Sequence, residues 1–227
     1  RLQRTVEDYA LVNWLGFPSR GVDFVARRLA RRHSDAPVIG ISIGKGATTS
    51  IDNAEADYLG LLERLAPLAD YLVINVSSPN TPGLRRLEAG ARLGELLVAL
   101  TRRRDELVFR RSLPLLVKLS PDLGDRGLDD ALEAIDRAGM DGVVATNTTM
   151  RPEGGLSGAP LTELATQTVA EIHKRTGGTL PIVASGGVMS AADALAKVEA
   201  GASLVQVYTG LVYRGPRLIS EITAALG

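Results

Sequence analysis

Short apolar runs alternate with amphipathic stretches along most of the chain. The apolar runs are the length of a strand and rich in Val, Ile and Leu, whereas the stretches between them place apolar residues at helical spacing. The predicted strands are 37–44, 71–76, 113–119, 142–147, 181–185 and 203–208. The predicted helices are 21–32, 51–66, 87–109, 128–138, 161–176, 191–200 and 218–226, with a short helix within 1–15. This alternation predicts an α/β fold with a parallel sheet covered by helices.

Polar residues and glycines follow the C-terminal ends of the predicted strands. They are Ser42, Asn75 with Ser78, Lys118, Thr146 with Asn147, Gly186 with Gly187, and Tyr208 with Thr209. A ligand face made of several successive strand ends is typical of a (β/α)8 TIM barrel, because a doubly wound sheet gathers its ligand at one switch point. We therefore expect one barrel domain over 1–227, with about six of the eight strand-helix units present and the others before Arg1.

Composition narrows the classes of function. Hydrophobic residues make up 45% and aromatic residues 4%, so the core must consist of aliphatic side chains, as under a parallel sheet. The formal net charge is zero, which gives no support to nucleic-acid binding, and the Arg-rich runs 27–32 and 102–111 are expected on solvated helix faces. No run of 18 apolar residues or leader-like segment is present, so we expect no membrane span and no signal peptide in this sequence.

Two residue types that often carry chemistry are scarce. The absence of Cys excludes disulfides, Cys-ligated zinc and a thiol nucleophile. The only histidines, His33 and His173, are expected on the surfaces of helices and are too few for a His-based metal site or a Ser-His triad. We therefore expect no metal site.

The stretch 75–84, which we call the polar corner, follows a hydrophobic strand and is dense in polar side chains. Two Asn, two Ser and a Thr fall within seven residues, and Pro79 and Pro82 restrict the backbone that carries them. Ser78 has no His to activate it, so as a base it would need a relay through Thr81 and an ordered water. The amides Asn13, Asn75, Asn80 and Asn147 suit a ligand with alternating N–H and C=O groups, such as a pyrimidine ring, although each one alone is more typical of a turn or cap.

Lys118 and three glycine-rich turns indicate a charged ligand. Lys118 lies in an otherwise apolar strand, where it could form a structural ion pair, a Schiff base, or a fixed cation beside a negatively charged cofactor ring. The turns at 154–158, 185–187 and 209–210 let the backbone approach an anion closely, and the loops after the last two strands of a barrel are the usual phosphate site.

Seven stretches occur in one order over nearly the whole chain: 13–17, 41–45, 75–84, 117–123, 145–149, 154–158 and 205–210. Together they resemble the dihydroorotate dehydrogenase family, the flavin enzymes of pyrimidine synthesis. The soluble class of that family typically has Cys at the position of Ser78, so Ser78 resembles the quinone-dependent class. The resemblance implies oxidation of dihydroorotate to orotate, with a hydride passing to FMN and electrons then to a quinone. It also implies peripheral association with the cytoplasmic face of the cell membrane, through a segment outside these residues.

The resemblance also implies roles for individual residues. Ser78 would be the base, Thr81 and Phe17 would line the proton relay, and Lys118 would favour the reduced flavin. The substrate ring would be held by Asn13, Trp14, Leu15, Gly16, Phe17, Asn75, Asn80, Asn147 and Thr148. FMN would be contacted by Ser42, Asn75, Lys118, Thr146, Gly158, Gly187, Tyr208 and Thr209, with the last four around its phosphate.

The sequence departs from this family in three places. Ser42 stands where the family usually has Asn, and the loop 150–153 is shorter than the expected lid. The first two barrel strands and the membrane-associating helices are missing from these residues, so the segment is not expected to act alone. Two other interpretations stay open: a flavin-free phosphate-binding lyase or aldolase that uses Lys118, and a non-catalytic barrel fragment that binds a ligand or partner.

Overall fold

The computed structural model describes residues 2–33, 35–81, 83–88, 90–107 and 112–227. Its main body is a six-stranded sheet in the order β10-β9-β6-β5-β4-β3, in which every pairing is parallel. The strands are β3 (Gly40–Ile43), β4 (Tyr71–Asn75), β5 (Leu115–Leu119), β6 (Gly142–Ala145), β9 (Ile182–Ser185) and β10 (Leu204–Gln206). The six predicted parallel strands are thus confirmed, each within one to three residues of its predicted ends.

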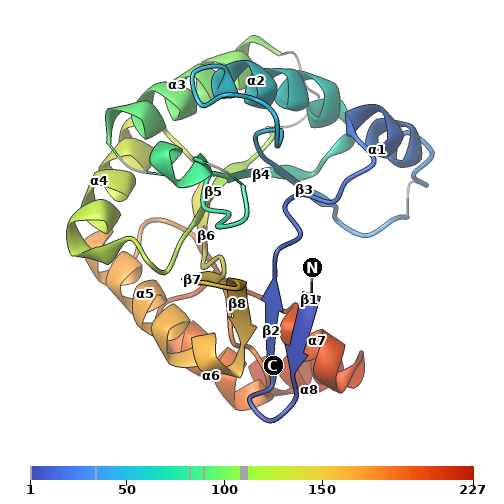
Figure 1. Cartoon of the computed structure of the whole chain (residues 1–227), viewed down its shortest axis with the longest axis vertical. Coiled ribbons are helices and arrows are strands. Elements are labelled where there is room, and N and C mark those ends of the chain that lie inside the picture. The colour runs from blue at the N-terminus through green and yellow to red at the C-terminus, as the bar shows by residue number, and fades with distance from the viewer. Residues whose placement is uncertain (1, 34, 82, 89, 108–111) are drawn as a thin grey trace.

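Helices cover the outer face of this sheet and follow one another around it, so that the whole curls like part of a TIM barrel (Figure 1). They are α1 (Val22–Leu29), α2 (Ala54–Leu65), α3 (Ala91–Glu106), α4 (Gly124–Arg137), α5 (Thr162–Arg175), α6 (Ala191–Glu199) and α8 (Arg217–Leu226). Helix α7 (Thr209–Arg214) packs against α8 and β8 instead. The 3-10 turns are η1 (Ala66–Leu68), η2 (Leu84–Leu87) and η3 (Ala159–Leu161). Pro82 and the end of the predicted helix 87–109, at 108–109, lie outside the described residues.

The register of the sheet separates the core from the ligand side. On the outer face, side chains such as Ile74, Val117 and Val143 are fully buried beneath the helices. On the inner face, Val73, Leu116 and Val144 form a smaller cluster. Strands buried on both faces have near-continuous apolar sequences, and these apolar runs located them in the sequence.

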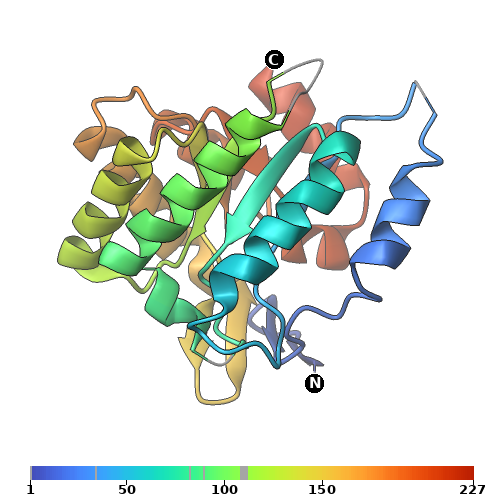
Figure 2. The ribbon, with the colours of Figure 1, turned by 90° about the horizontal axis from the view of Figure 1, so that it is seen from above.

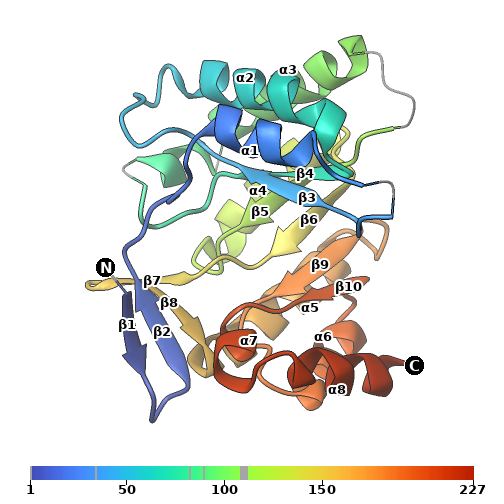
Figure 3. The ribbon, with the colours of Figure 1, turned by 90° about the vertical axis from the view of Figure 1, so that its right-hand side faces the viewer.

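Four strands that the apolar pattern did not predict form a second, antiparallel sheet in the order β1-β2-β8-β7. They are β1 (Leu2–Thr5), β2 (Ala10–Asn13), β7 (Thr149–Arg151) and β8 (Gly154–Gly158). This sheet lies against one end of the parallel sheet (Figure 3), and its two hairpins project from the same side of the molecule (Figure 2).

The short helix predicted within 1–15 is wrong, because β1 and β2 form a hairpin there. Val6 and Tyr9, whose spacing suggested a helix, are exposed at the hairpin turn, whereas Ala10 and Leu11 are buried. Pairing of β2 with β8 decides the conformation of this segment, and that pairing is a tertiary contact that local spacing does not reveal.

The glycine-rich turn predicted at 154–158 is also wrong as a turn, because this segment is strand β8. Its glycines allow an unusually close approach to β2. A Cβ at Gly154 would lie 2.3 Å from Asn13 O, and one at Gly158 would lie 2.2 Å from Tyr9 O. The glycines therefore serve strand packing as well as the pocket described below.

Three smaller expectations also differ from the structure. His33 lies after the end of α1, while His173 is in α5 as predicted, and both are exposed. The Arg-rich runs are not uniformly solvated, because Arg32 pairs with Asp70 and Arg104 with Asp141. Within the described ranges, no helix is long and apolar enough to cross a membrane.

Candidate functional site

A pocket of about 350 Å3 lies at the C-terminal ends of the parallel strands. Its walls come from the ends of β4, β5, β6, β9 and β10 on one side, and from β2, β8 and the segment after β2 on the other. This size falls in the range of pockets for cofactors and small molecules, roughly 300 to 1,000 Å3. The parallel sheet therefore supplies one wall of the pocket, and the antiparallel sheet supplies the other.

Most of the residues predicted for the site line this pocket. They are Asn13, Leu15, Gly16, Phe17, Asn75, Ser78, Asn80, Lys118, Thr146, Asn147, Thr148, Gly158, Gly187, Tyr208 and Thr209.

Three predicted site residues do not line the pocket. Thr81 is buried behind it, Trp14 is 51% exposed, and Ser42 is exposed on β3. Ser42 lies in register with Val73 on the inner face, but β3 is the edge strand of the sheet. The roles predicted for Thr81, Trp14 and Ser42 therefore remain predictions.

The polar corner after β4 is fixed by hydrogen bonds between side chains. Asn147 Nδ2 donates to Asn75 Oδ1 at 3.2 Å and to Ser77 Oγ at 3.0 Å. Ser77 Oγ in turn donates to Lys118 O at 2.6 Å. Ser77 is fully buried, and sequence reasoning gave it no role. Its place in the polar stretch was the only signal, and its effect is to hold the ends of β4, β5 and β6 in fixed relative positions.

A second pair of amides joins this corner to the antiparallel sheet. Asn80 Nδ2 donates to both Asn13 O and Asn13 Oδ1 at 2.9 Å, and Asn13 Nδ2 donates to Gly155 O at 3.2 Å. Asn80 Oδ1 is buried and accepts no hydrogen bond from the described residues. Because a buried acceptor without a donor is costly, this oxygen is suited to a ligand N–H.

Lys118 has no hydrogen-bond acceptor or ion-pair partner among the residues that the structure describes. It lies on β5 in register with Asn75. Burial lowers the pKa of Lys118 from its ordinary value. The structural ion pair considered from the sequence is therefore not found within the described part of the chain, and the ammonium is free for a ligand in the pocket.

Ser78 lines the same pocket and is buried. Its hydroxyl has no hydrogen-bond partner among the residues that the structure describes. Neither histidine lies in the lining. A conventional Ser-His nucleophile is thus not assembled here, and the hydroxyl faces the pocket without an activating side chain.

The opposite end of the pocket, at β9 and β10, is built from closely packed glycine backbone. A Cβ at Gly187 would lie 2.3 Å from Thr162 Cα, and one at Gly210 would lie 2.1 Å from Val188 O. Thr209 Oγ1 donates to Ser157 Oγ at 2.8 Å, which ties the start of α7 to β8. Bare backbone of this kind can approach an anion such as a phosphate.

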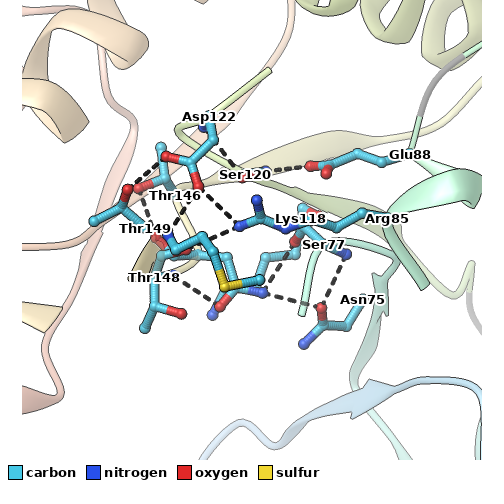
Figure 4. Close-up of polar contacts among 12 residues, drawn as sticks. Asn75, Ser77, Arg85, Glu88, Lys118, Ser120, Asp122, Thr146, Thr148 and Thr149 are labelled. Carbon is cyan, nitrogen blue, oxygen red and sulfur yellow. Dashed lines mark hydrogen bonds and ion pairs between the residues drawn. The ribbon is translucent and has the colours of Figure 1, made fainter. Parts of the chain in front are cut away.

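Behind the pocket, Asp122 connects three segments (Figure 4). It accepts hydrogen bonds from Arg85 Nη2 at 2.9 Å, from Thr149 Oγ1 at 2.5 Å and from Met150 N at 2.9 Å. This carboxylate therefore holds the β7–β8 hairpin against the loop after β5. The stretch 117–123 was recognised in the sequence, but no role was assigned to Asp122.

Glu88 also holds the loop after β5 in place. It is buried and accepts a short hydrogen bond from Ser120 N, and Ser120 Oγ accepts one from Asp122 N at 3.1 Å. Burial raises the pKa of Glu88 to about 7, against smaller opposing effects of the Ser120 N–H and of Arg85. Figure 4 shows this line of contacts from Glu88 through Ser120 to Asp122.

Comparison with known proteins agrees with this geometry. A family profile described as dihydroorotate dehydrogenase matches residues 1–227. The chain belongs to the dihydroorotate dehydrogenase family. The resemblance found in the seven sequence stretches is confirmed at the level of the family.

Relatives within the dihydroorotate dehydrogenase family are close. A dihydroorotate dehydrogenase (quinone) of Anaeromyxobacter sp. (strain Fw109-5) is 48% identical over 239 residues, which cover 100% of this chain and 65% of that protein. One of Marinomonas sp. (strain MWYL1) is 42% identical over 238 residues and covers 99% of this chain and 68% of that protein. The chain therefore spans about 65% of the length of the Anaeromyxobacter relatives it matches.

Solved dihydroorotate dehydrogenase structures share the fold. A crystal structure of DHODH from Eimeria tenella in complex with ferulenol has a TM-score of 0.91 and 36% identity, and covers 100% of this chain and 69% of that chain. The ligand-free DHODH of the same organism has a TM-score of 0.93 and 35% identity, with coverage of 100% and 71%. These neighbours support the TIM-barrel-like α/β fold, of which this chain contains a part.

Proposed function

We propose that the full-length protein oxidises dihydroorotate to orotate in pyrimidine biosynthesis, passing a hydride to FMN and then electrons to a quinone. The observation that carries this proposal is the unpaired Lys118 ammonium in a pocket walled by the Asn75–Asn147 pair and Ser78. The relatives named dihydroorotate dehydrogenase (quinone) support the same activity.

The pocket fits FMN in two respects. Its glycine end, at Gly158 and Gly187, lines the pocket with backbone that carries no side chain, and such backbone can approach a phosphate closely. Its other end offers a cation and amides for a flavin ring, at Lys118, Asn75 and Thr146. We assign Tyr208 and Thr209 to the phosphate end and keep Ser42 as a further contact of the ring. When bound, FMN supplies the acceptor for the hydride that leaves the substrate.

The amides of the polar corner would hold and orient the substrate ring. Asn80 Oδ1 is a buried acceptor with no donor in the described chain, and it matches a ring N–H. The hydrogen bonds of Asn80 with Asn13, and of Asn147 with Asn75, hold these amide groups in place before a ligand enters. We also assign Trp14, Leu15, Gly16, Phe17 and Thr148 to the surroundings of the substrate.

Ser78 would take the proton from C5 of dihydroorotate. A serine hydroxyl is a weak base, so it requires a site closed to bulk water and a path for the proton. Ser78 and Thr81 are both buried, which fits a closed relay, and Phe17 lines the same pocket as Ser78. Lys118 would favour the reduced flavin by stabilising its negative charge.

We further propose that residues 1–227 are one FMN-binding domain to which the first two barrel strands are added beside β3. Support comes from β3 itself, an edge strand whose inner-face residue Ser42 is exposed. To reach its quinone, the protein would associate peripherally with the cytoplasmic face of the cell membrane through a segment outside these residues. The proposal includes neither nucleic acid nor a metal among the partners.

One observation favours a second candidate. The lowered pKa of Lys118 is what an amine nucleophile needs, so a phosphate-binding lyase or aldolase that forms a Schiff base would use the same residue. Borohydride trapping with a carbonyl substrate tests this candidate, because only a Schiff base leaves a stable adduct on Lys118.

The proposed function is tested by the visible spectrum of the full-length protein before and after anaerobic addition of dihydroorotate. We expect a flavin spectrum that bleaches with substrate. Ser78→Ala should keep its FMN and bleach at least about a hundredfold more slowly, the usual loss when a positioned base is removed. The exposed Ser50→Ala is the matched control and should bleach as the wild type does.

Three outcomes would count against parts of this assignment. A colourless protein that FMN does not reconstitute would refute the flavin enzyme. A yellow protein that neither dihydroorotate nor quinone changes would favour the non-catalytic fragment. Unchanged bleaching in Ser78→Ala would remove Ser78 as the base and leave the cofactor assignment intact.

A further inference from the structure

A buried cation lies directly behind the glycine end of the pocket. Lys197 on α6 is fully buried, and its ammonium donates to Thr166 Oγ1 at 3.0 Å and to Thr162 O at 3.5 Å. Both acceptors are neutral groups on α5. No carboxylate forms an ion pair with Lys197 within the described residues, so no direct contact neutralises its charge in the interior.

The contacts of Lys197 lead to the pocket through one residue. Thr162 Oγ1 donates to Gly187 O at 2.8 Å, and a Cβ at Gly187 would lie 2.3 Å from the N and Cα atoms of Thr162. Gly187 itself lines the pocket. The ammonium of Lys197 is therefore separated from the pocket by the first residue of α5 and one glycine.

The elements packed around Lys197 place no unengaged carboxylate against its ammonium within the described residues. Asp193 on the same helix already accepts from Met189 N at 3.0 Å and Ser190 Oγ at 2.9 Å at the start of α6. The other helix packed on α6 is α8, which presents Leu218 and Ile222 to it. No charged group of α5 contacts Lys197 among the described residues.

A bound phosphate would compensate such a charge. Backbone N–H groups and helix ends contribute only partial charges, whereas an ammonium contributes a full one, and charges interact strongly where water is excluded. We infer that Lys197 is a positioning residue for the phosphate end of the pocket, which holds Gly187 in place through Thr162 and attracts the phosphate group of the cofactor. This inference rests on the proposed function, in which that phosphate belongs to FMN.

The charge of Lys197 depends on pH, and so should the attraction for a phosphate. Burial lowers the pKa of Lys197 to about 8, and the nearby Asp193 opposes this effect. The ammonium is therefore charged at neutral pH and loses its charge as the pH rises through about 8. Attraction for a phosphate should weaken over the same interval, while a ligand without a phosphate should be indifferent to it.

The test compares FMN with riboflavin, which has the same ring and no phosphate. Flavin-depleted full-length protein is titrated with each flavin, and dissociation constants are read from the change in flavin fluorescence. Lys197→Met should bind FMN at least about tenfold more weakly, because the charge interaction with the phosphate is lost. Riboflavin has no phosphate, so its affinity should stay at the wild-type value. Lys197→Arg should restore FMN binding, and the exposed Lys174→Met, at the other end of α5, is the matched control.

A second measurement varies the pH. For the wild type, the ratio of FMN affinity to riboflavin affinity should fall between about pH 7 and pH 9, and for Lys197→Met it should stay flat. Equal losses of FMN and riboflavin affinity in Lys197→Met, or a wild-type ratio that does not change with pH, would overturn the inference alone. Wild-type protein that binds neither flavin would overturn the proposed function and the inference with it.

Discussion

Glu88 offers a test of how burial controls stability beneath the pocket. Its carboxyl group is buried and accepts a hydrogen bond from Ser120 N, and burial raises its pKa from 4.5 to about 7. Glu88→Gln keeps an oxygen that can accept this hydrogen bond and removes the charge at every pH. The variant therefore separates the cost of the charge from the value of the contact.

The expected magnitude follows from the two pKa values. The folded protein holds the Glu88 proton more tightly than the unfolded chain, so this group stabilises the fold fully below about pH 4.5 and the contribution is lost as the pH rises through about 7. The gap between the two pKa values corresponds to about 3 kcal/mol. Glu88→Gln should thus match the wild type at about pH 4 and have a free energy of unfolding about 3 kcal/mol higher at about pH 8.5.

Urea unfolding followed by circular dichroism at several pH values measures this difference. Glu199→Gln, which changes an exposed carboxylate, is the control and should follow the wild type throughout. Glu88→Ala should be less stable than Glu88→Gln at every pH, because it leaves the Ser120 N–H without its acceptor. Parallel pH profiles for the wild type and Glu88→Gln would refute the reasoning, since they would mean that the buried carboxyl group does not change its ionisation on folding.

Three further predictions concern the pocket walls. Gly187→Ala should abolish FMN binding, measured as flavin absorbance per protein, because its Cβ would lie 2.3 Å from backbone atoms of α5 at a φ of +67°. Tyr58→Phe removes a 2.8 Å hydrogen bond to Asn75 O and should lower the free energy of unfolding by about 1 to 3 kcal/mol in urea titrations, with an unchanged value refuting a role for that bond. Asp122→Ala should free the β7–β8 hairpin, so that endoproteinase Glu-C cuts after Glu153 several-fold faster than in the wild type, whereas equal rates would show that other contacts hold the hairpin.

The parallel sheet and its helices could be predicted because their signal is local. β4 and β5 are buried on both faces, and their sequences are accordingly apolar runs bounded by polar residues. The antiparallel sheet could not be predicted in this way, because β2 and β8 are short and stabilise each other only through pairing across a separation of 142 residues between Asn13 and Gly155. Helix α7 was missed for a similar reason, since its six residues carry too little periodicity.

The residues of the candidate site likewise divide into those with a local sequence signal and those that only the fold reveals. Asn75, Lys118 and Asn147 follow apolar strands, and the rule that ligands bind at strand ends was enough to place them in one pocket. Glu88 and Lys197 were missed because a charged residue in a helical or loop pattern is normally solvent-exposed, and only the fold shows that these two are buried.

The pairing of β2 with β8 also sets an order of events during synthesis. At about 5 to 20 residues per second, roughly 7 to 30 s pass between the emergence of β2 from the ribosome and that of its partner strand. Throughout this interval the backbone groups of β2 have no partner in β8, and one wall of the pocket is absent. The nascent chain therefore cannot complete this wall of the pocket before β8 is made, and the strands of the glycine end, β9 and β10, follow later still.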